Sequence, residues 1–154
     1  MSSICVRTPL RFLLSALCFL PVGAVEAQRG VEGGVHSLAT FSEHSLGGAG
    51  LHFSLRPGGR ARFSLGATGG VQDEHAALRA EATGQFLLNP GSRSRGFYAG
   101  GGLAGVVGRV ENAYLLLILG MESRPGGGSG WVVETGVGGG FRVLVGYRWR
   151  KLKP

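Results

Sequence analysis

The sequence predicts an all-β chain that folds, after an N-terminal signal peptide, into an eight-stranded antiparallel up-and-down transmembrane β-barrel. Three observations lead to this fold class. Glycine makes up 30 of the 154 residues, which disfavours helices because each interior glycine costs about 1 kcal/mol relative to alanine. Apolar and polar residues alternate along much of the chain, as they do in strands with two unlike faces. Turn-forming residues interrupt this alternation at short intervals.

Residues 1–27 have the organisation of a cleaved secretory signal peptide. Two arginines precede an apolar run at residues 12–24, and small residues follow at the position where a signal peptidase cuts. The run is shorter than the roughly 20 apolar residues that a membrane-spanning helix needs. We therefore expect cleavage between Ala27 and Gln28, which leaves residues 28–154 as one domain. A retained anchor and a lipoprotein signal are the less favoured alternatives.

The cysteines and the charge of the mature chain exclude several functions. Cys5 and Cys18 leave with the signal peptide, so a disulfide framework and a cysteine nucleophile are both excluded. Loss of Arg7, Arg11 and Glu26 leaves 14 of the 16 basic and 8 of the 9 acidic residues, a net charge of +6. The basic residues form no stripe interleaved with aromatic residues, so nucleic acid is not expected as a partner. We also expect no cofactor.

The first four predicted strands differ in how clearly their two faces separate. Residues 30–40 alternate weakly, whereas residues 51–56 place leucine and phenylalanine on one face and histidine, serine and arginine on the other. Residues 61–71 repeat this division. Residues 76–88 show it best, because one face is wholly apolar or small and the other carries Arg, Glu, Thr and Gln in succession.

The last four predicted strands fall into two pairs. Residues 97–107 and 113–121 are apolar on both faces, so the sequence does not show which residues point inward. Residues 131–137 and 141–149 alternate clearly again. Strands of 9 to 11 tilted residues are long enough to cross a bilayer, and most of these segments reach that length.

Seven short breaks separate the eight strands. Every second break contains a Pro-Gly pair, which favours a tight turn because proline fixes φ and glycine tolerates positive φ. All the breaks are short, so neighbouring strands are predicted to pair as antiparallel hairpins. None of them has room for a crossover helix.

The charged residues of the strands indicate a membrane barrel with a filled lumen. A soluble barrel carries its charges outside, at about 25 to 35% of the surface, whereas only 16% of this chain is charged. In an eight-stranded barrel the side chains fill the interior. We predict that the strand glycines, such as Gly66, Gly100, Gly102, Gly136 and Gly146, make room there for long arginines. The predicted interior polar network consists of Arg62, Arg79, Glu81, Glu134, Arg142 and Arg148.

The sequence resembles the small eight-stranded outer-membrane β-barrel families of Gram-negative bacteria. The resemblance rests on the signal peptide, the eight alternating segments and the closing segment, residues 141–149, in which aromatic and apolar residues alternate with others. Aromatic residues also lie near the segment ends, where an interfacial girdle is expected. They are Phe97, Tyr98, Tyr114, Trp131, Phe141, Tyr147 and Trp149.

This resemblance implies a location in the outer membrane, with outer-membrane lipid as a partner. It also implies that the barrel assembly machinery recognises the strand from Phe141 to Trp149, although the families tend to end at the aromatic residue and this chain continues through residues 150–154. Both chain ends would face the periplasm. The external loops would then be short and acidic, whereas the periplasmic turns and the tail would be basic, Arg56 among them.

His52 and Ser54 are the weak candidates for catalysis. They lie on one face of a predicted strand, and with Glu32 or Glu81 nearby they would have the residue types of a Ser-His-Glu hydrolase. Some outer-membrane lipid A deacylases use such residues, but the flanking motif of that family is missing here. We interpret the pair as hydrogen-bonded interior residues.

A second cluster of polar residues lies in two neighbouring loops. Asp73, Glu74 and His75, joined by Glu43 and His44, have the oxygen and imidazole ligands that could hold a divalent cation. Three adjacent residues cannot all point at one ion without a bent backbone. We therefore expect a solvated loop and no metal site.

The leading hypothesis is a small monomeric outer-membrane barrel without enzymatic activity, with a filled interior, no open pore and a structural or surface-interaction role. One alternative is an outer-membrane barrel enzyme that acts on lipid A or phospholipid through His52 and Ser54. The other is a soluble exported barrel that binds an apolar ligand, as lipocalin-like folds do.

Overall fold

The computed structural model describes residues 30–152, and these residues form eight β-strands. The predicted signal peptide, with Ala27 and Gln28, lies outside the described residues. Within residues 30–152 no helix is long and apolar enough to cross a membrane. The strands are β1 (Gly30–Phe41), β2 (Leu46–Gly58), β3 (Ala61–Gln72), β4 (His75–Leu87), β5 (Arg95–Val107), β6 (Asn112–Ser123), β7 (Ser129–Val137) and β8 (Phe141–Leu152).

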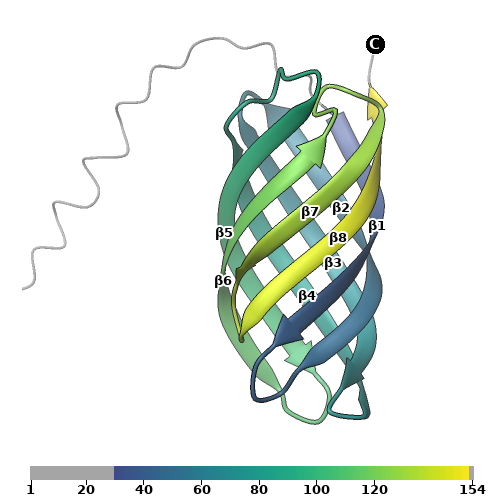
Figure 1. The fold of residues 1–154 in the computed structure, drawn as a ribbon, viewed down its shortest axis with the longest axis vertical. Coiled ribbons are helices and arrows are strands. Elements are labelled where there is room, and N and C mark those ends of the chain that lie inside the picture. The colour runs from purple at the N-terminus through teal and green to yellow at the C-terminus, as the bar shows by residue number, and fades with distance from the viewer. Residues whose placement is uncertain (1–29, 153–154) are drawn as a thin grey trace, which may run out of the picture.

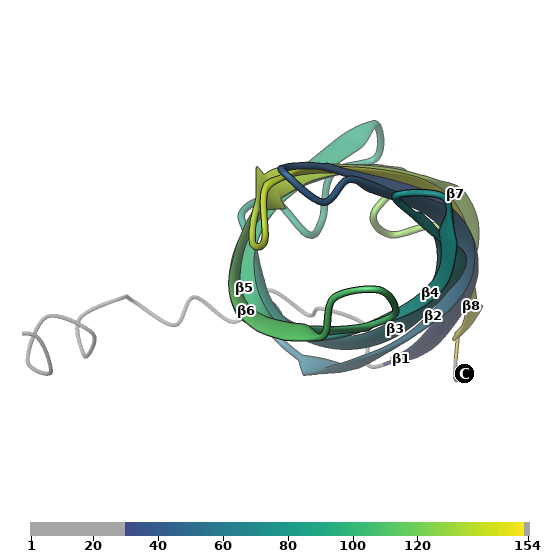
Figure 2. The same ribbon diagram turned by 90° about the horizontal axis from the view of Figure 1, so that it is seen from below.

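The eight strands form a closed antiparallel up-and-down barrel, as predicted. Each strand pairs with its neighbour in the sequence, and β8 pairs with β1 to close the ring (Figures 1 and 2). Following the paired residues around the barrel from Val31 of β1 leads back to β1 at Phe41, ten residues further along the strand, which is the shear of the barrel. The residues met on the way are Leu55, Phe63, Gly84, Gly101, Leu117, Val137 and Phe141. With this shear, strand geometry gives a tilt of about 40° from the barrel axis.

The barrel has two ends that differ in their connections. We call the end where β1 begins and β8 ends the terminal end, at the top of Figure 1, and the opposite end the hairpin end. The shortest of the connections at the hairpin end joins β3 to β4 through Asp73 and Glu74, both with positive φ (46° and 69°). Two consecutive residues of this kind are typical of a type I′ turn, whose twist matches that of the flanking strands.

Several strands are longer than the sequence predicted. β2 begins at Leu46, because residues 46–48 pair with β1 and β3 where the sequence suggested a loop. β8 continues to Leu152, so Arg150 is part of the strand and pairs with Glu32 of β1. The assignment of residue 150 to a tail and of Arg56 to a turn was therefore wrong.

Apolar side chains cover the outer face and charged side chains lie inside. Large hydrophobic residues such as Leu65, Leu103 and Leu115 are about two-thirds exposed or more on the outer wall. Between the strand ends, no charged residue of the described chain points outward. The structure also shows which residues of β5 and β6 point inward, which the sequence left open. They include Tyr98 and Val106 of β5 and Leu116 and Ile118 of β6.

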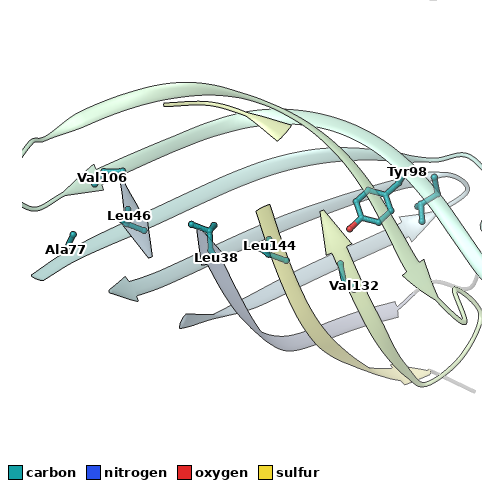
Figure 3. Close-up of a cluster of buried hydrophobic side chains, with 8 residues drawn as sticks. Leu38, Leu46, Ala77, Tyr98, Val106, Val132 and Leu144 are labelled. Carbon is teal, nitrogen blue, oxygen red and sulfur yellow. The ribbon is translucent and has the colours of Figure 1, made fainter. Parts of the chain in front are cut away.

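A second set of interior residues is apolar. Leu46, Ala77 and Val106 lie near the hairpin end, with Leu38 and Leu144 further along the lumen (Figure 3). Tyr114 packs against this group. These apolar side chains share the hairpin end of the lumen with Arg79 and Arg142, which pair in register with Val106 and Thr40. The other interior charged residues lie nearer the terminal end.

The aromatic girdle is only partly as predicted. Phe97, Trp131 and Trp149 are about half exposed on the outer wall near the terminal end. Tyr98 is 1% exposed inside the barrel, where its hydroxyl donates to Glu134. Its assignment to the girdle was therefore wrong, since the residue belongs to the inward-facing set of β5. Tyr114 likewise packs inside.

The strand glycines have a different role from the one predicted. A Cβ on Gly102 or Gly136 would meet the backbone of the neighbouring strand, at the carbonyl oxygens of Ala82 and Leu117 respectively. A Cβ on Gly120 would overlap the Tyr98 ring. Gly102 and Gly136 therefore allow close approach of neighbouring strands, and Gly120 that of an aromatic ring. For Gly102 and Gly136 the predicted role of making room for arginine was wrong.

Candidate functional site

The first group of interior charges, which we call the terminal cluster, fills the lumen near the terminal end. Glu122 is fully buried and accepts two hydrogen bonds from Arg56 Nη2, at 2.8 and 2.9 Å, and one from Arg62 Nη1 at 2.8 Å. Arg148 Nε lies 3.1 Å from the same carboxylate. One carboxylate thus holds three guanidinium groups. The terminal cluster comprises Glu32, Arg56, Arg62, Glu122, Arg148 and Arg150.

Glu32 is the second anion of the terminal cluster. Its Oε1 accepts from Arg150 Nε at 2.6 Å and lies 2.8 Å from Arg56 Nε. Arg62 Nη1 is 3.7 Å from its Oε2. Because Glu32 is in β1 and Arg150 in β8, this contact ties the first strand to the last across the closing seam.

The second group, the central cluster, lies further from the terminal end. Arg142 makes paired contacts with Glu81, at 3.0 Å from Nε and 2.7 Å from Nη2, and donates to Glu134 at 2.8 Å. Arg79 donates to Glu81 at 2.7 Å. Two arginines and two glutamates balance each other, and such paired, charge-assisted contacts are the strong ones.

Two uncharged side chains connect the clusters. Gln85 accepts a hydrogen bond from Arg62 Nε in the terminal cluster and donates to Glu134 in the central cluster at 3.4 Å. The Tyr98 hydroxyl donates to Glu134 at 2.8 Å, while the Arg62 guanidinium lies 4.2 Å from the centre of its ring. The interior charges therefore form one connected network that crosses the lumen.

The connection between β6 and β7 closes the terminal end. Pro125 is among the most deeply buried side chains. Arg150 donates to its carbonyl oxygen at 2.9 Å, and Arg148 Nη2 donates to the carbonyls of Ser123 and Arg124 at 3.2 and 2.9 Å. This turn is held over the end of the lumen by the same arginines that bind the two glutamates.

The structure places the weak catalytic candidates inside the barrel without joining them. The Ser54 hydroxyl lies 2.7 Å from that of Ser64. His52 packs against His36, with ring centroids 5.6 Å apart, and His36 Nε2 is 2.8 Å from the Thr68 hydroxyl. Among the described residues, no hydrogen bond links His52 to Ser54. The geometry is that of interior polar pairs, not of an activated nucleophile, which needs its base within hydrogen-bond reach.

The loop residues considered for metal binding are only partly brought together. His44 Nδ1 is 2.7 Å from Asp73 Oδ2, which joins the β1–β2 and β3–β4 connections at the hairpin end. His75 Nδ1 contacts the backbone carbonyl of Asp73 at 2.8 Å. Within the described chain, no group of three or more potential ligands surrounds one point.

All six residues of the predicted network lie inside the barrel and form ion pairs with one another or with further partners. Sequence reasoning missed four other members, Glu32, Arg56, Glu122 and Arg150. They lie near strand ends, where charge is usually attributed to solvated turns. For Glu32, Arg56 and Arg150 the signal that could have found them is phase, because each continues the two-residue period of the inward face of its strand. For Glu122 the sequence carries no such signal, because its strand is apolar on both faces.

The interior glutamates are expected to matter more for stability than the loop carboxylates. Glu81→Ala or Glu134→Ala removes an anion that pairs with buried Arg142, and an unpaired buried charge costs about 3–5 kcal/mol. Asp73→Ala changes a partly exposed pair worth about 0–1 kcal/mol. Unfolding midpoints in detergent should therefore fall much further for the two interior variants. Equal midpoints for all three variants would contradict the network's structural role.

A closed eight-stranded barrel with a charged lumen and an apolar outer wall is the class of structure that these observations define. The fold is similar to the N-terminal β-barrel domain of Pseudomonas aeruginosa OprF. The TM-score is 0.57 at 10% sequence identity, and the match covers 80% of this chain and 100% of that one. No family model and no curated protein matches the sequence. At this level of identity the similarity shows the shared fold.

Proposed function

We propose that the protein is a small integral outer-membrane β-barrel with a structural or surface-interaction role, a filled interior and no open pore. The observation that carries this proposal is the distribution of side chains in the barrel wall. Ten charged residues face the lumen, whereas leucine, valine and aromatic side chains face outward. A soluble ligand-binding barrel has the opposite arrangement, with charges outside and an apolar interior.

The dimensions of the outer wall support the membrane location. Strands of about 12 residues tilted by about 40° span about 28 Å along the axis, close to the roughly 25 Å apolar band of transmembrane barrels. A closed barrel leaves no sheet edge unpaired, which lipid requires. The fold similarity to the OprF domain agrees with this proposal.

The packing of the lumen supports the absence of a pore. Apolar residues such as Leu46 and Val106 fill the hairpin end together with Arg79, which donates to the Gly138 carbonyl, and the arginine-held turn at Pro125 covers the terminal end. Between them lies a cavity of about 40 Å³. That volume holds a few water molecules and no continuous aqueous path.

The proposal includes an orientation and an assembly partner. The terminal end exposes Arg60, Arg93, Arg95 and Arg124, and the hairpin end exposes Glu43, Glu74 and Glu111. With the chain ends in the periplasm, the acidic end faces outward and its loops offer a small surface for interaction. The outer face of β8, from Phe141 to Trp149, is the surface that the barrel assembly machinery would recognise. The barrel acts as a monomer in contact with outer-membrane lipid.

Fractionation of cells that produce the full chain tests the proposal. We expect the protein in the outer-membrane fraction, with a gel mobility that changes on heating in detergent, and no conductance steps when the purified protein is added to planar bilayers. We also expect His52→Ala to leave extracted lipid A unchanged. A soluble periplasmic protein without a heat-dependent shift would exclude the membrane role, and sustained conductance would exclude the closed lumen.

A further inference from the structure

The terminal cluster contains more positive than negative charge. It has four arginines and two glutamates, all of which are at least nine-tenths buried (Glu32, Arg56, Arg62, Glu122, Arg148 and Arg150). Arginine is not deprotonated in proteins, so loss of protons cannot remove the excess. A buried charge without compensation is strongly unfavourable. The excess of two positive charges therefore calls for a counter-charge from another source.

Other side chains of the described chain do not supply this counter-charge. The central cluster is already neutral, with Arg79 and Arg142 against Glu81 and Glu134. The exposed charged side chains described at the terminal end are all arginines, at positions 60, 93, 95 and 124. The exposed acidic residues, Glu43, Glu74 and Glu111, lie at the opposite, hairpin end of the barrel.

A polar cavity lies directly against the terminal cluster. Its volume is about 40 Å³, and its charged wall consists of three arginines and three glutamates, Arg62, Arg142, Arg148, Glu32, Glu81 and Glu134. Ser54 and Ser64 also line it. Arg148 is 1% exposed, and its Nη1 has no hydrogen-bond partner among the described residues. Glu32 Oε1 lies 3.8 Å from this atom. A buried guanidinium donor is thus free at the wall of the cavity.

The two serines supply a second donor. The Ser54 and Ser64 hydroxyls lie 2.7 Å apart and share one hydrogen bond, so the proton of the accepting hydroxyl is available for another acceptor. Both serines are on the inward faces of adjacent strands, β2 and β3, and both line the cavity. The three glutamates of the wall are each already paired with an arginine, and the ten interior charges sum to +2. Free guanidinium and hydroxyl donors in such a network are the chemistry that recognises an anion.

We propose that this cavity binds a small monovalent anion of chloride size, held by Arg148 Nη1 and the Ser54–Ser64 pair and compensating the charge of the terminal cluster. A cavity of about 40 Å³ accepts a halide ion and has no room for a lipid phosphate or a sugar acid. Water alone would satisfy the donors and leave the charge uncompensated. The anion is a structural ligand that enters as the barrel forms.

Refolding the full chain in detergent at equal ionic strength in sodium chloride or sodium gluconate tests this proposal. Gluconate is too large for the cavity, so only chloride binds the folded state. Because a ligand that binds only the folded state raises its stability, we expect a melting temperature higher by about 5 °C or more in chloride. Equal melting temperatures in the two salts would overturn the proposal.

Three variants separate the cavity from general salt effects. Arg148→Met removes the donor and one excess charge while Glu122 keeps Arg56 and Arg62, so the difference between the two salts should shrink. Ser54→Asp places a carboxylate in the cavity and should remove the chloride dependence even if Arg148→Met folds poorly. Arg60→Met, at an exposed position of the same end, should keep the full difference. A chloride effect that is unchanged in both interior variants would overturn the proposal.

Bromide supplies a direct measurement. Crystals of the full chain grown in bromide should show an anomalous peak next to Arg148 Nη1, and crystals of Ser54→Asp should not. A cavity without an anomalous peak in the unsubstituted protein would show that water alone fills it, which contradicts the proposal.

Discussion

Glu122→Gln is expected to lower the free energy of unfolding by about 3–5 kcal/mol, the range found when one partner of a buried ion pair is removed. Glu122 is 0% exposed and contacts Arg56, Arg62 and Arg148. When the charge of Glu122 is removed, Glu32 is the one carboxylate that remains for the four arginines of the terminal cluster. Urea unfolding in detergent measures this change in free energy, with the heat-dependent gel shift as the readout of the folded fraction.

Two controls make this result specific to the terminal cluster. Glu111→Gln removes the same charge from an exposed loop at the hairpin end and should change stability by less than about 0.5 kcal/mol. The double variant Glu122→Gln with Arg148→Met removes one charge of each sign. It should be less destabilised than the two single variants predict together, because contacting residues do not act independently. Unaltered unfolding of Glu122→Gln would show that the cluster does not stabilise the barrel.

Leu117→Arg is the second change with a large expected effect. Leu117 is the sixth of twelve residues in β6, points outward and is 66% exposed. If the outer wall faces lipid, arginine at this depth costs about 2–4 kcal/mol. If the wall faced water, a surface substitution of this kind would change stability by less than about 0.5 kcal/mol. Unfolding from lipid vesicles measures the difference.

Val71→Arg is the matched control for depth. Val71 is the eleventh of twelve residues in β3, also points outward and is 54% exposed, but it lies near the hairpin end. Arginine near the interface costs only about 0–1 kcal/mol, because the side chain reaches the headgroups. Equal effects of Leu117→Arg and Val71→Arg would contradict the proposed membrane location of the barrel.

The sequence was most informative where the two faces of a strand differ chemically. In β4 and in residues 141–149 of β8 the alternation predicted which side chains point inward, and Arg79 and Arg142 lie there. In β5 and β6 the inner wall is itself apolar, since Leu116 and Ile118 face the lumen. Alternation then disappears from the sequence although the strands are regular, and only the pairing register shows their phase.

The interior network was predictable in kind but not in extent. Arg62 and Glu134 lie within strong alternating segments, so their inward direction followed from the pattern. Glu122 follows a long apolar run, and Arg150 follows the last aromatic residue, so both resemble residues of solvated ends. Which glutamate meets which arginine depends on the shear of the closed barrel. That quantity arises only from the pairing of all eight strands and cannot be read from one segment.

The seam between β1 and β8 has a consequence for the order of folding. Glu32 and Arg150 are 118 residues apart in the sequence, yet they form one of the closest ion pairs in the barrel. The terminal cluster therefore cannot be completed until the last strand has been delivered to the first. Before closure, these arginines and glutamates would lie on one face of an open sheet, with no closed lumen around them. A chain truncated before Arg148 would keep the pairing of residues 141–147 with β1 but would lack two of the four arginines of the terminal cluster.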